Sequence, residues 1–227
     1  MTKFRNRTEA GRRLAERLRH LRGTNPVVYA LPRGGVPVAL PIAEALGAPL
    51  DLMLVRKIGA PGQPELALGA VVEGDPPQTV VNEDVAALVG VPPDFVTMEA
   101  ARLLGEIDRR RRLWLRERPA VSPHGRVAIV VDDGIATGAT VRAALLALER
   151  AGAARRVVAA PVAARPTAEA LRSQCDEAVF LEEPEFLGAV GSFYDDFRQI
   201  EDAEVSALLR RAASSAAPAR REDGPAR

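Results

Sequence analysis

The sequence predicts a single α/β domain in which a mainly parallel sheet is flanked by helices. Short runs rich in Val, Ala and Leu alternate with helix-like segments along the chain, as parallel sheets with crossover helices require. The chain has 227 residues, a length that α/β folds often reach as one unit. We therefore expect one domain over residues 1–211 and a disordered tail over 212–227, where Ala, Ser, Pro and Arg dominate.

The expected elements follow this alternation in order. Apolar runs predict strands at 27–31, 50–55, 67–72, 127–131, 157–162 and 178–181. Helical spacing of apolar residues predicts helices at 8–21, 36–46, 93–118, 141–151, 167–174 and 201–211. Thr8 is available to cap the first helix, and Gly47 and Gly152 are placed to end two others. Because residues 56–66 are rich in Gly and Pro, they predict a long mobile loop.

Composition limits the function classes. The formal net charge of +1 excludes the global basic field of a dedicated nucleic-acid binder, so any anion site must be local. The single cysteine, Cys175, cannot form a disulfide within the chain and is expected to pack. The two histidines, His20 and His124, are isolated in sequence and offer little material for a zinc site. A polar, basic start and the lack of an apolar stretch of ~20 residues lead us to expect a cytoplasmic protein without membrane contact.

The most informative stretch, residues 127–140, reads VAIVVDDGIATGAT. A buried strand is expected to deliver Asp132 and Asp133, followed by a turn that opens a helix. Glycines in such a turn let backbone N–H groups approach a ligand, threonine hydroxyls can donate hydrogen bonds, and the helix N-terminus favours an anion. Two carboxylates at the carboxyl end of a strand can accept hydrogen bonds from vicinal sugar hydroxyls. The stretch therefore predicts a sugar-phosphate site.

Two other interpretations of this stretch are a turn without a ligand and a nucleotide-binding loop. Residues 132–140 could simply end a strand, with an aspartate N-cap and a Gly/Thr-rich turn. A Walker-type nucleotide loop is a poorer match, because the lysine of GxxxxGK[ST] is missing, and GxGxxG is missing as well.

Residues 127–140 resemble the motif that binds phosphoribosyl pyrophosphate (PRPP) in type I phosphoribosyltransferases. Three more segments match that family in order and spacing. LPRGG at 31–35 resembles its pyrophosphate loop, which often contains a non-proline cis peptide bond, so the bond from Pro32 to Arg33 is expected to be cis or distorted. The RK pair at 56–57 resembles the start of the mobile catalytic loop, and residues 186–195 resemble part of the C-terminal hood, placed at about 182–200. Together, LPRGG, the segment that begins with the RK pair, and FYDDF at 193–197 resemble a bacterial group of phosphoribosyltransferase-domain proteins whose acceptor is not evident.

The resemblance implies a type I phosphoribosyltransferase fold and a role for each matching residue. Lys57, Arg56 and Glu65 would be catalytic, the two cations toward the leaving pyrophosphate and Glu65 as a general acid or base. Asp132 and Asp133 would engage the ribose hydroxyls and, through ribose or water, Mg²⁺. The remaining PRPP contacts would be made by Arg33, Gly34, Gly35, Ala136, Thr137, Gly138, Ala139 and Thr140. The acceptor would contact Phe186, Tyr194 and Asp195.

One departure bears on the acceptor. Ala136 stands where the family's 6-oxopurine enzymes carry an aspartate, whereas adenine- and uracil-type members have alanine. This argues against hypoxanthine and guanine as acceptors.

The implied function is transfer of phosphoribose from PRPP to a nitrogenous acceptor, expected to be a nucleobase in nucleotide salvage. The alternative is a PRPP-sensing regulator on the same fold that binds nucleic acid through the basic run 109–112. Acidic residues interleave with that run, which is typical of a solvated or subunit-facing helix surface. Because Arg56 and Lys57 are retained, the enzyme is favoured and no nucleic-acid partner is expected. We also expect a homo-oligomer.

Overall fold

The computed structural model describes residues 3–74, 76–92 and 94–216. Its core is a five-stranded sheet with the order β2-β1-β6-β7-β8, in which every neighbouring pair is parallel. The strands are β1 (Pro26–Ala30), β2 (Leu50–Leu52), β6 (Val127–Val131), β7 (Arg155–Val162) and β8 (Glu177–Glu182). β6 matches its predicted bounds, because an uninterrupted apolar run in a central strand is buried on both faces.

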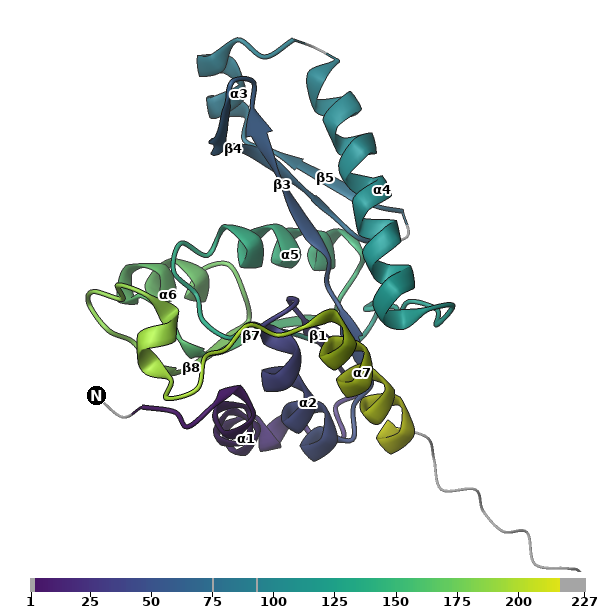
Figure 1. Cartoon of the computed structure of the whole chain (residues 1–227), viewed down its shortest axis with the longest axis vertical. Coiled ribbons are helices and arrows are strands. Elements are labelled where there is room, and N and C mark those ends of the chain that lie inside the picture. The colour runs from purple at the N-terminus through teal and green to yellow at the C-terminus, as the bar shows by residue number, and fades with distance from the viewer. Residues whose placement is uncertain (1–2, 75, 93, 217–227) are drawn as a thin grey trace, which may run out of the picture.

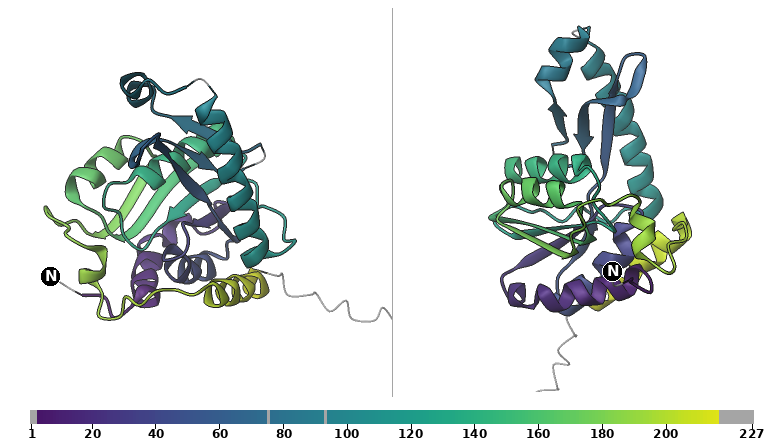
Figure 2. Two further views of the ribbon diagram at one scale, coloured as in Figure 1. Left: turned by 45° about the horizontal axis from the view of Figure 1, so that its top comes forward. Right: turned by 90° about the vertical axis from the view of Figure 1, so that its left-hand side faces the viewer.

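Helices cover both faces of this sheet (Figure 2, right). One face packs against α1 (Arg7–Arg17), α2 (Gly35–Leu46) and α7 (Asp202–Ala216), and the other against α5 (Ala139–Arg150) and α6 (Arg165–Arg172). Gly47 ends α2 with φ 65°, a left-handed conformation that glycine adopts without strain. The predicted α/β class with a mainly parallel sheet is therefore confirmed.

A second unit projects from the core (Figure 1), and we call residues 55–115 the arm. It contains a three-stranded antiparallel sheet of β3 (Val55–Ala60), β4 (Gln63–Val72) and β5 (Gln78–Val81). Two helices complete it, α3 (Glu83–Val89) and α4 (Phe95–Leu115). Ile58 and Leu68 are fully buried in a cluster that also holds Ile107 of α4, so the arm has an apolar interior continuous with the core.

The prediction of a loop at 56–66 is wrong, because these residues form most of a β-hairpin. Pro61 and Gly62 occupy its turn, and Gly62 has φ 72°. The same Gly and Pro content that suggested a loop is what a tight turn and an irregular register at Gly59 need. The predicted strand at 67–72 belongs to this hairpin and not to the parallel sheet.

Three further predictions differ from the structure. The predicted strand at 50–55 is divided, since β2 ends at Leu52 and β3 begins at Val55. The first helix is capped by Asn6, whose side chain accepts a hydrogen bond from the Glu9 amide at 2.9 Å, rather than by Thr8. The last helix continues through 212–216, residues assigned to the tail, because Ala212 is buried in the core cluster. The rest of the predicted tail, 217–227, lies outside the described residues.

A charged triad joins the arm to the core. Arg111 of α4 bonds to Glu73 at the end of β4 and lies 3.4 Å from Asp51 of β2. Asp51 is only 1% exposed and also accepts backbone hydrogen bonds from Leu52 at 2.8 Å and Val121 at 2.7 Å. Burial raises the pKa of Glu73 to about 7, with the charge of Asp51 adding to the rise and that of Arg111 opposing it.

We expect the stability contributed by Glu73 to depend on pH. Because the folded protein keeps the Glu73 proton up to about pH 7 and the unfolded chain releases it near the ordinary value of 4.5, this contribution is complete below pH 4.5 and is lost as pH rises to about 7. Glu73→Gln resembles the protonated form. Relative to wild type, its free energy of unfolding should therefore rise by about 1–3 kcal/mol between pH 5 and pH 8. Urea unfolding at both pH values measures this, with the exposed Glu117→Gln as control. A pH-independent difference would contradict it.

Candidate functional site

Two predicted motifs meet at the carboxyl ends of β1 and β6, which are parallel neighbours. Leu31 donates its backbone N–H to the Val131 carbonyl at 2.9 Å, and the chain then enters the LPRGG loop. The peptide bond between Pro32 and Arg33 is cis, which confirms the expectation for this loop. A Cβ atom at Gly35 would lie 2.5 Å from the Val131 carbonyl oxygen, and one at Gly34 would lie 1.9 Å from Asp133 Oδ2. The loop thus packs directly on the double-carboxylate turn.

Gly34 is therefore expected to be essential for the position of Asp133. In Gly34→Ala the new methyl group must displace the Asp133 carboxylate, since neither atom can occupy the other's space. If Asp133 serves ligand binding, affinity for PRPP with Mg²⁺ should fall about tenfold, by the loss of one charged hydrogen bond. Isothermal titration measures this. Gly105→Ala in α4, where a Cβ meets nothing within 4 Å, is the matched control, and equal affinities of the two variants would contradict the prediction.

The turn after the carboxylates is fixed by β7 and α6. Ile135 donates its N–H to the Val162 carbonyl at 2.9 Å, and the Thr167 hydroxyl donates to the Ala136 carbonyl at 2.6 Å. Gly138, with φ 73°, is the residue before α5 begins at Ala139. The turn therefore presents the positive N-terminus of a 12-residue helix beside two carboxylates, an arrangement that suits a phosphate attached to a sugar.

The two carboxylates have different surroundings. Asp132 Oδ1 accepts the Asp133 N–H at 2.9 Å. Burial, with the neighbouring charge of Asp133, raises the pKa of Asp132 well above its usual range, while Arg7 opposes the rise. Asp133 Oδ2 pairs with Arg7 Nε at 2.7 Å, and its carbonyl oxygen accepts a hydrogen bond from the Tyr194 hydroxyl at 2.5 Å.

The predicted pyrophosphate arginine, Arg33, is held by the start of α7. Its Nε lies 3.2 Å from Asp202 Oδ1, and its Nη1 donates to the Ile200 carbonyl at 3.1 Å. The same Asp202 oxygen accepts from Trp114 Nε1 at 3.0 Å. Because the Arg33 side chain stays 32% exposed, it can exchange these contacts for an anion.

The predicted loop cations lie in the arm on opposite faces of β3. Arg56 lies 3.8 Å from Glu106 of α4, and its pKa is lowered by burial and by the neighbouring Arg110. Lys57 is exposed and lines a groove of about 900 Å³ between the arm and α5. Thr140 also lines this groove and belongs to residues 134–140, which we call the phosphate turn after its predicted ligand. The position of β3 above α5 can be followed in Figure 1. The structure thus brings Lys57 and the turn to one groove.

The sequence model of the phosphoribosyl transferase domain matches residues 3–198. The chain belongs to the phosphoribosyl transferase domain family. Two Mycobacterium tuberculosis proteins, MT0597 of strain CDC 1551 / Oshkosh and Rv0571c of strain H37Rv, are provisionally named phosphoribosyl transferases. Each is 44% identical over 214 residues, which are 93% of this chain and 47% of theirs. The chain therefore spans about half the length of these relatives.

A solved structure resembles almost the whole domain. The crystal structure of TT1426 from Thermus thermophilus is 44% identical, with a TM-score of 0.81, and the match covers 92% of this chain and 99% of that one. Membership of the phosphoribosyl transferase domain family, with the parallel sheet and its flanking helices, confirms the predicted fold.

The hood segment of this phosphoribosyl transferase domain does not gather the predicted acceptor contacts. Phe186 is 87% exposed, and Asp195 is exposed with its backbone N–H bonded to the Phe4 carbonyl. Tyr194 is buried, and its hydroxyl donates a hydrogen bond to the backbone carbonyl of Asp133. Tyr194 therefore packs within the hood, and its contact with an acceptor stays a prediction. Glu65 lies within β4, but its side chain is outside the described part of the structure.

Sequence reasoning missed two contacts of the site. Val190 of the hood packs on the phosphate turn, since a Cβ at Gly134 would lie 2.3 Å from its Cγ1. Arg7 pairs with Asp133 across 126 positions of sequence. An arginine at the start of an amphipathic helix looks like a solvated residue, so the sequence carries no signal for this pair.

Among the helices that the structure describes, none combines the length and apolar character that crossing a membrane requires.

Proposed function

We propose that this protein transfers the 5-phosphoribosyl group from PRPP to a nitrogenous acceptor, a nucleobase in the simplest case, with release of pyrophosphate. A bond forms between the acceptor nitrogen and C1′ as the bond from C1′ to the pyrophosphate oxygen breaks, and the acceptor loses a proton. The observation that carries the proposal is the direct packing of the LPRGG loop on Asp133, beside the N-terminus of α5. There the pyrophosphate would contact the LPRGG loop, the ribose would contact the carboxylates, and the 5′-phosphate would contact the helix N-terminus.

Each part of the ligand has candidate contacts. The α5 N-terminus with Thr137 and Thr140 would bind the 5′-phosphate, and Asp132 and Asp133 would accept hydrogen bonds from the ribose hydroxyls. The loop glycines with Arg33 would contact the pyrophosphate. Lys57 would stabilise the charge that develops on the leaving group, which is where a cation contributes most to the rate.

Magnesium fits the donor set. In the described residues there is no group of three or more His, Cys, Asp or Glu side chains able to hold a metal ion. The two adjacent carboxylates still supply the oxygen ligands that Mg²⁺ prefers, and this ion commonly takes its other ligands from water and substrate phosphates. Asp132 and Asp133 would hold it through ribose or water, where it would neutralise pyrophosphate charge.

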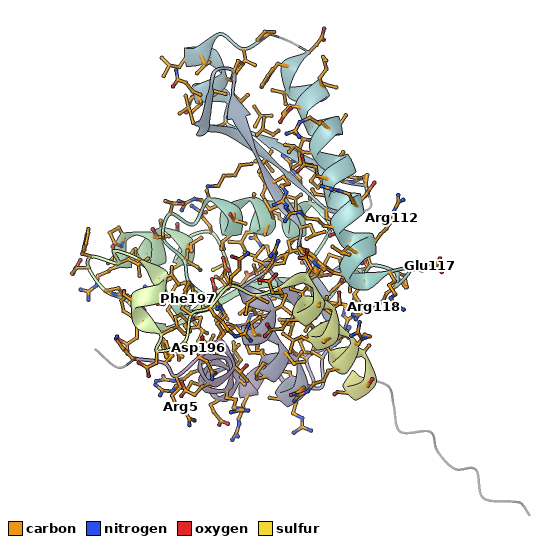
Figure 3. All side chains as sticks on the ribbon, in the orientation of Figure 1. Arg5, Arg112, Glu117, Arg118, Asp196 and Phe197 are labelled. Atoms are coloured by element: carbon orange, nitrogen blue, oxygen red, sulfur yellow. The ribbon has the colours of Figure 1, made fainter. Side chains whose placement is uncertain are left out.

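The arrangement of the arginines in the basic run 109–112 weighs against the alternative function, a regulator that binds nucleic acid. Arg111 is bound inside the charged triad with Asp51 and Glu73, and the Arg110 guanidinium lies 5.9 Å from the centre of the Trp114 ring. Arg112 points away from the molecule (Figure 3). The run is therefore divided between interior and surface and does not form one phosphate-binding face.

A screen of nucleobases for PRPP-dependent release of pyrophosphate tests the proposal. Adenine and uracil are expected ahead of hypoxanthine and guanine, because Ala136 replaces the aspartate of 6-oxopurine enzymes. The product should be the corresponding nucleoside monophosphate. Binding of PRPP without turnover on any acceptor would favour the sensor, whereas no binding of PRPP would contradict both functions.

A further inference from the structure

Arg7 is the first residue of α1, yet its side chain is buried between Asp133 and the hood. Its Nε donates to Asp133 Oδ2 at 2.7 Å, and its Nη1 donates to the Arg198 carbonyl at 2.9 Å. Its guanidinium carbon lies 3.8 Å from the centre of the Phe197 ring, within the range of a cation–π contact. A planar guanidinium held by two hydrogen bonds and a ring has one orientation.

The chain around Arg7 is joined to the hood by backbone hydrogen bonds. Phe4 donates to the Phe193 carbonyl at 2.8 Å and accepts from the Asp195 N–H at 2.8 Å, and Arg5 accepts from the Asp196 N–H at 3.0 Å. Figure 3 shows Arg5, Asp196 and Phe197 on the same side of the molecule. Residues 4–7 and 193–198 therefore form one unit, and Arg7 connects this unit to the carboxylate pair.

The contact with Arg7 leaves Asp133 with one occupied and one open oxygen. Arg7 takes Oδ2, whereas no hydrogen bond to Oδ1 occurs among the described residues. Oδ1 is not among the fully buried oxygens without a partner in that part of the chain, so part of its surface stays exposed to solvent. Gly34 packs against the whole carboxylate, since a Cβ there would lie 1.9 Å from Oδ2 and 3.0 Å from Oδ1, and the Tyr194 hydroxyl donates to the Asp133 carbonyl. The carboxylate has little freedom to turn.

Stability alone does not explain a buried ion pair at this place. The Arg7 and Asp133 side chains are 9% and 16% exposed, and a buried pair often stabilises a fold no more than apolar residues of the same volume. What Arg7 adds is a fixed cation beside two adjacent carboxylates, where an anionic ligand is also expected. It offsets the charge of Asp133, which burial and the neighbouring Asp132 make costly.

We propose that Arg7 is a positioning residue of the phosphoribosyl site, an inference that rests on the proposed function. By holding Oδ2 of Asp133, it presents Oδ1 to a ribose hydroxyl of PRPP. Because Arg7 also bonds to the hood, the position of the hood and of residues 4–7 is linked to PRPP binding. Arg7 itself does not contact the reacting atoms.

A double-mutant cycle on PRPP affinity tests this role. Isothermal titration of PRPP in the presence of Mg²⁺ gives the dissociation constant of the full chain and of Arg7→Gln, Asp133→Asn and the double variant. Arg7→Gln is expected to weaken binding about tenfold or more, as loss of a well-placed charged hydrogen bond does. Since Arg7 acts through Asp133, the double variant should bind no more weakly than Asp133→Asn alone.

Two further variants separate positioning from general support of the fold. Arg7→Lys keeps a cation for Asp133 but cannot also bond to Arg198 and stack on Phe197, so its affinity should lie between wild type and Arg7→Gln. Arg12→Gln changes an exposed arginine of the same helix and should bind as wild type does. In turnover assays the KM for PRPP should rise more than kcat falls for Arg7→Gln.

The outcomes are distinguishable. Unchanged affinity of Arg7→Gln, or additive effects in the cycle, would overturn the positioning role while leaving the proposed function intact. If Arg7→Gln does not fold, the same cycle is measured with Arg7→Lys, and additivity there overturns the inference. Failure of the wild type to bind PRPP overturns the proposed function first.

Discussion

PRPP with Mg²⁺ is expected to raise the melting temperature of this protein by about 5–10 °C. A ligand that binds only the folded state stabilises it by mass action, by about 2.7 kcal/mol at a hundredfold excess over the dissociation constant. For a domain of this size, each kcal/mol moves the melting temperature by roughly 2–4 °C. Differential scanning fluorimetry measures the shift. The same result is expected whether the protein is an enzyme or a sensor, so it tests the site independently of the acceptor.

Substitutions in the site should remove most of that shift. Asp132→Asn with Asp133→Asn replaces carboxylates by amides, which are weaker acceptors for ribose hydroxyls and no longer attract the magnesium complex. Removal of the hydroxyls by Thr137→Val and Thr140→Val should reduce the shift through the 5′-phosphate. Asp108→Asn, on the exposed surface of α4, is the control and should respond as wild type does. If any polyanion shifts the melting temperature as much as PRPP does, residues 132–140 are only a turn that ends a strand.

The parallel core could be predicted from sequence because its signals are local. β6 is a continuous apolar run, and α2 stops at a glycine with a left-handed conformation. The site residues at 31–35 and 132–140 could be expected to converge, since the carboxyl ends of neighbouring parallel strands lie at one edge of the sheet. The two segments then pack directly on each other at Gly34, where a side chain would collide with Asp133.

The arm could not be predicted in the same way, because its structure depends on pairing between segments. β3 reads VRKIGA, with two adjacent cations and a glycine, and it is a strand because β4 lies beside it and Ile58 and Leu68 are buried in the same cluster. The short strand β5 and helix α3 give even weaker local signals. Arg7 shows the same limit in the site, since its partner is determined by how the hood folds back on the N-terminal segment.

Replacing Lys57 by alanine is expected to lower kcat by about 100-fold and to change the affinity for PRPP much less. Lys57 lies on β3 and lines the groove that Thr140 of the phosphate turn shares. The contacts with PRPP that we propose for the carboxylates and the α5 N-terminus do not involve Lys57. In the open groove its ammonium group is exposed, so its interaction with the ground-state ligand is screened by water. Substrate in the groove would displace this water as negative charge grows on the leaving pyrophosphate. A cation placed there contributes mainly to the transition state, and loss of one such group costs about 10²–10³ in rate.

Single-turnover kinetics and titration with PRPP separate the two effects. Lys57→Arg should recover part of the rate, because it restores the charge with a different shape, and the surface variant Lys3→Ala should be unaffected. If Lys57→Ala weakens PRPP binding as much as it slows turnover, Lys57 is a binding residue of the ground state. Unchanged turnover removes Lys57 from the mechanism and leaves Arg56, held near Glu106 at 3.8 Å, as the cation of the arm to test next.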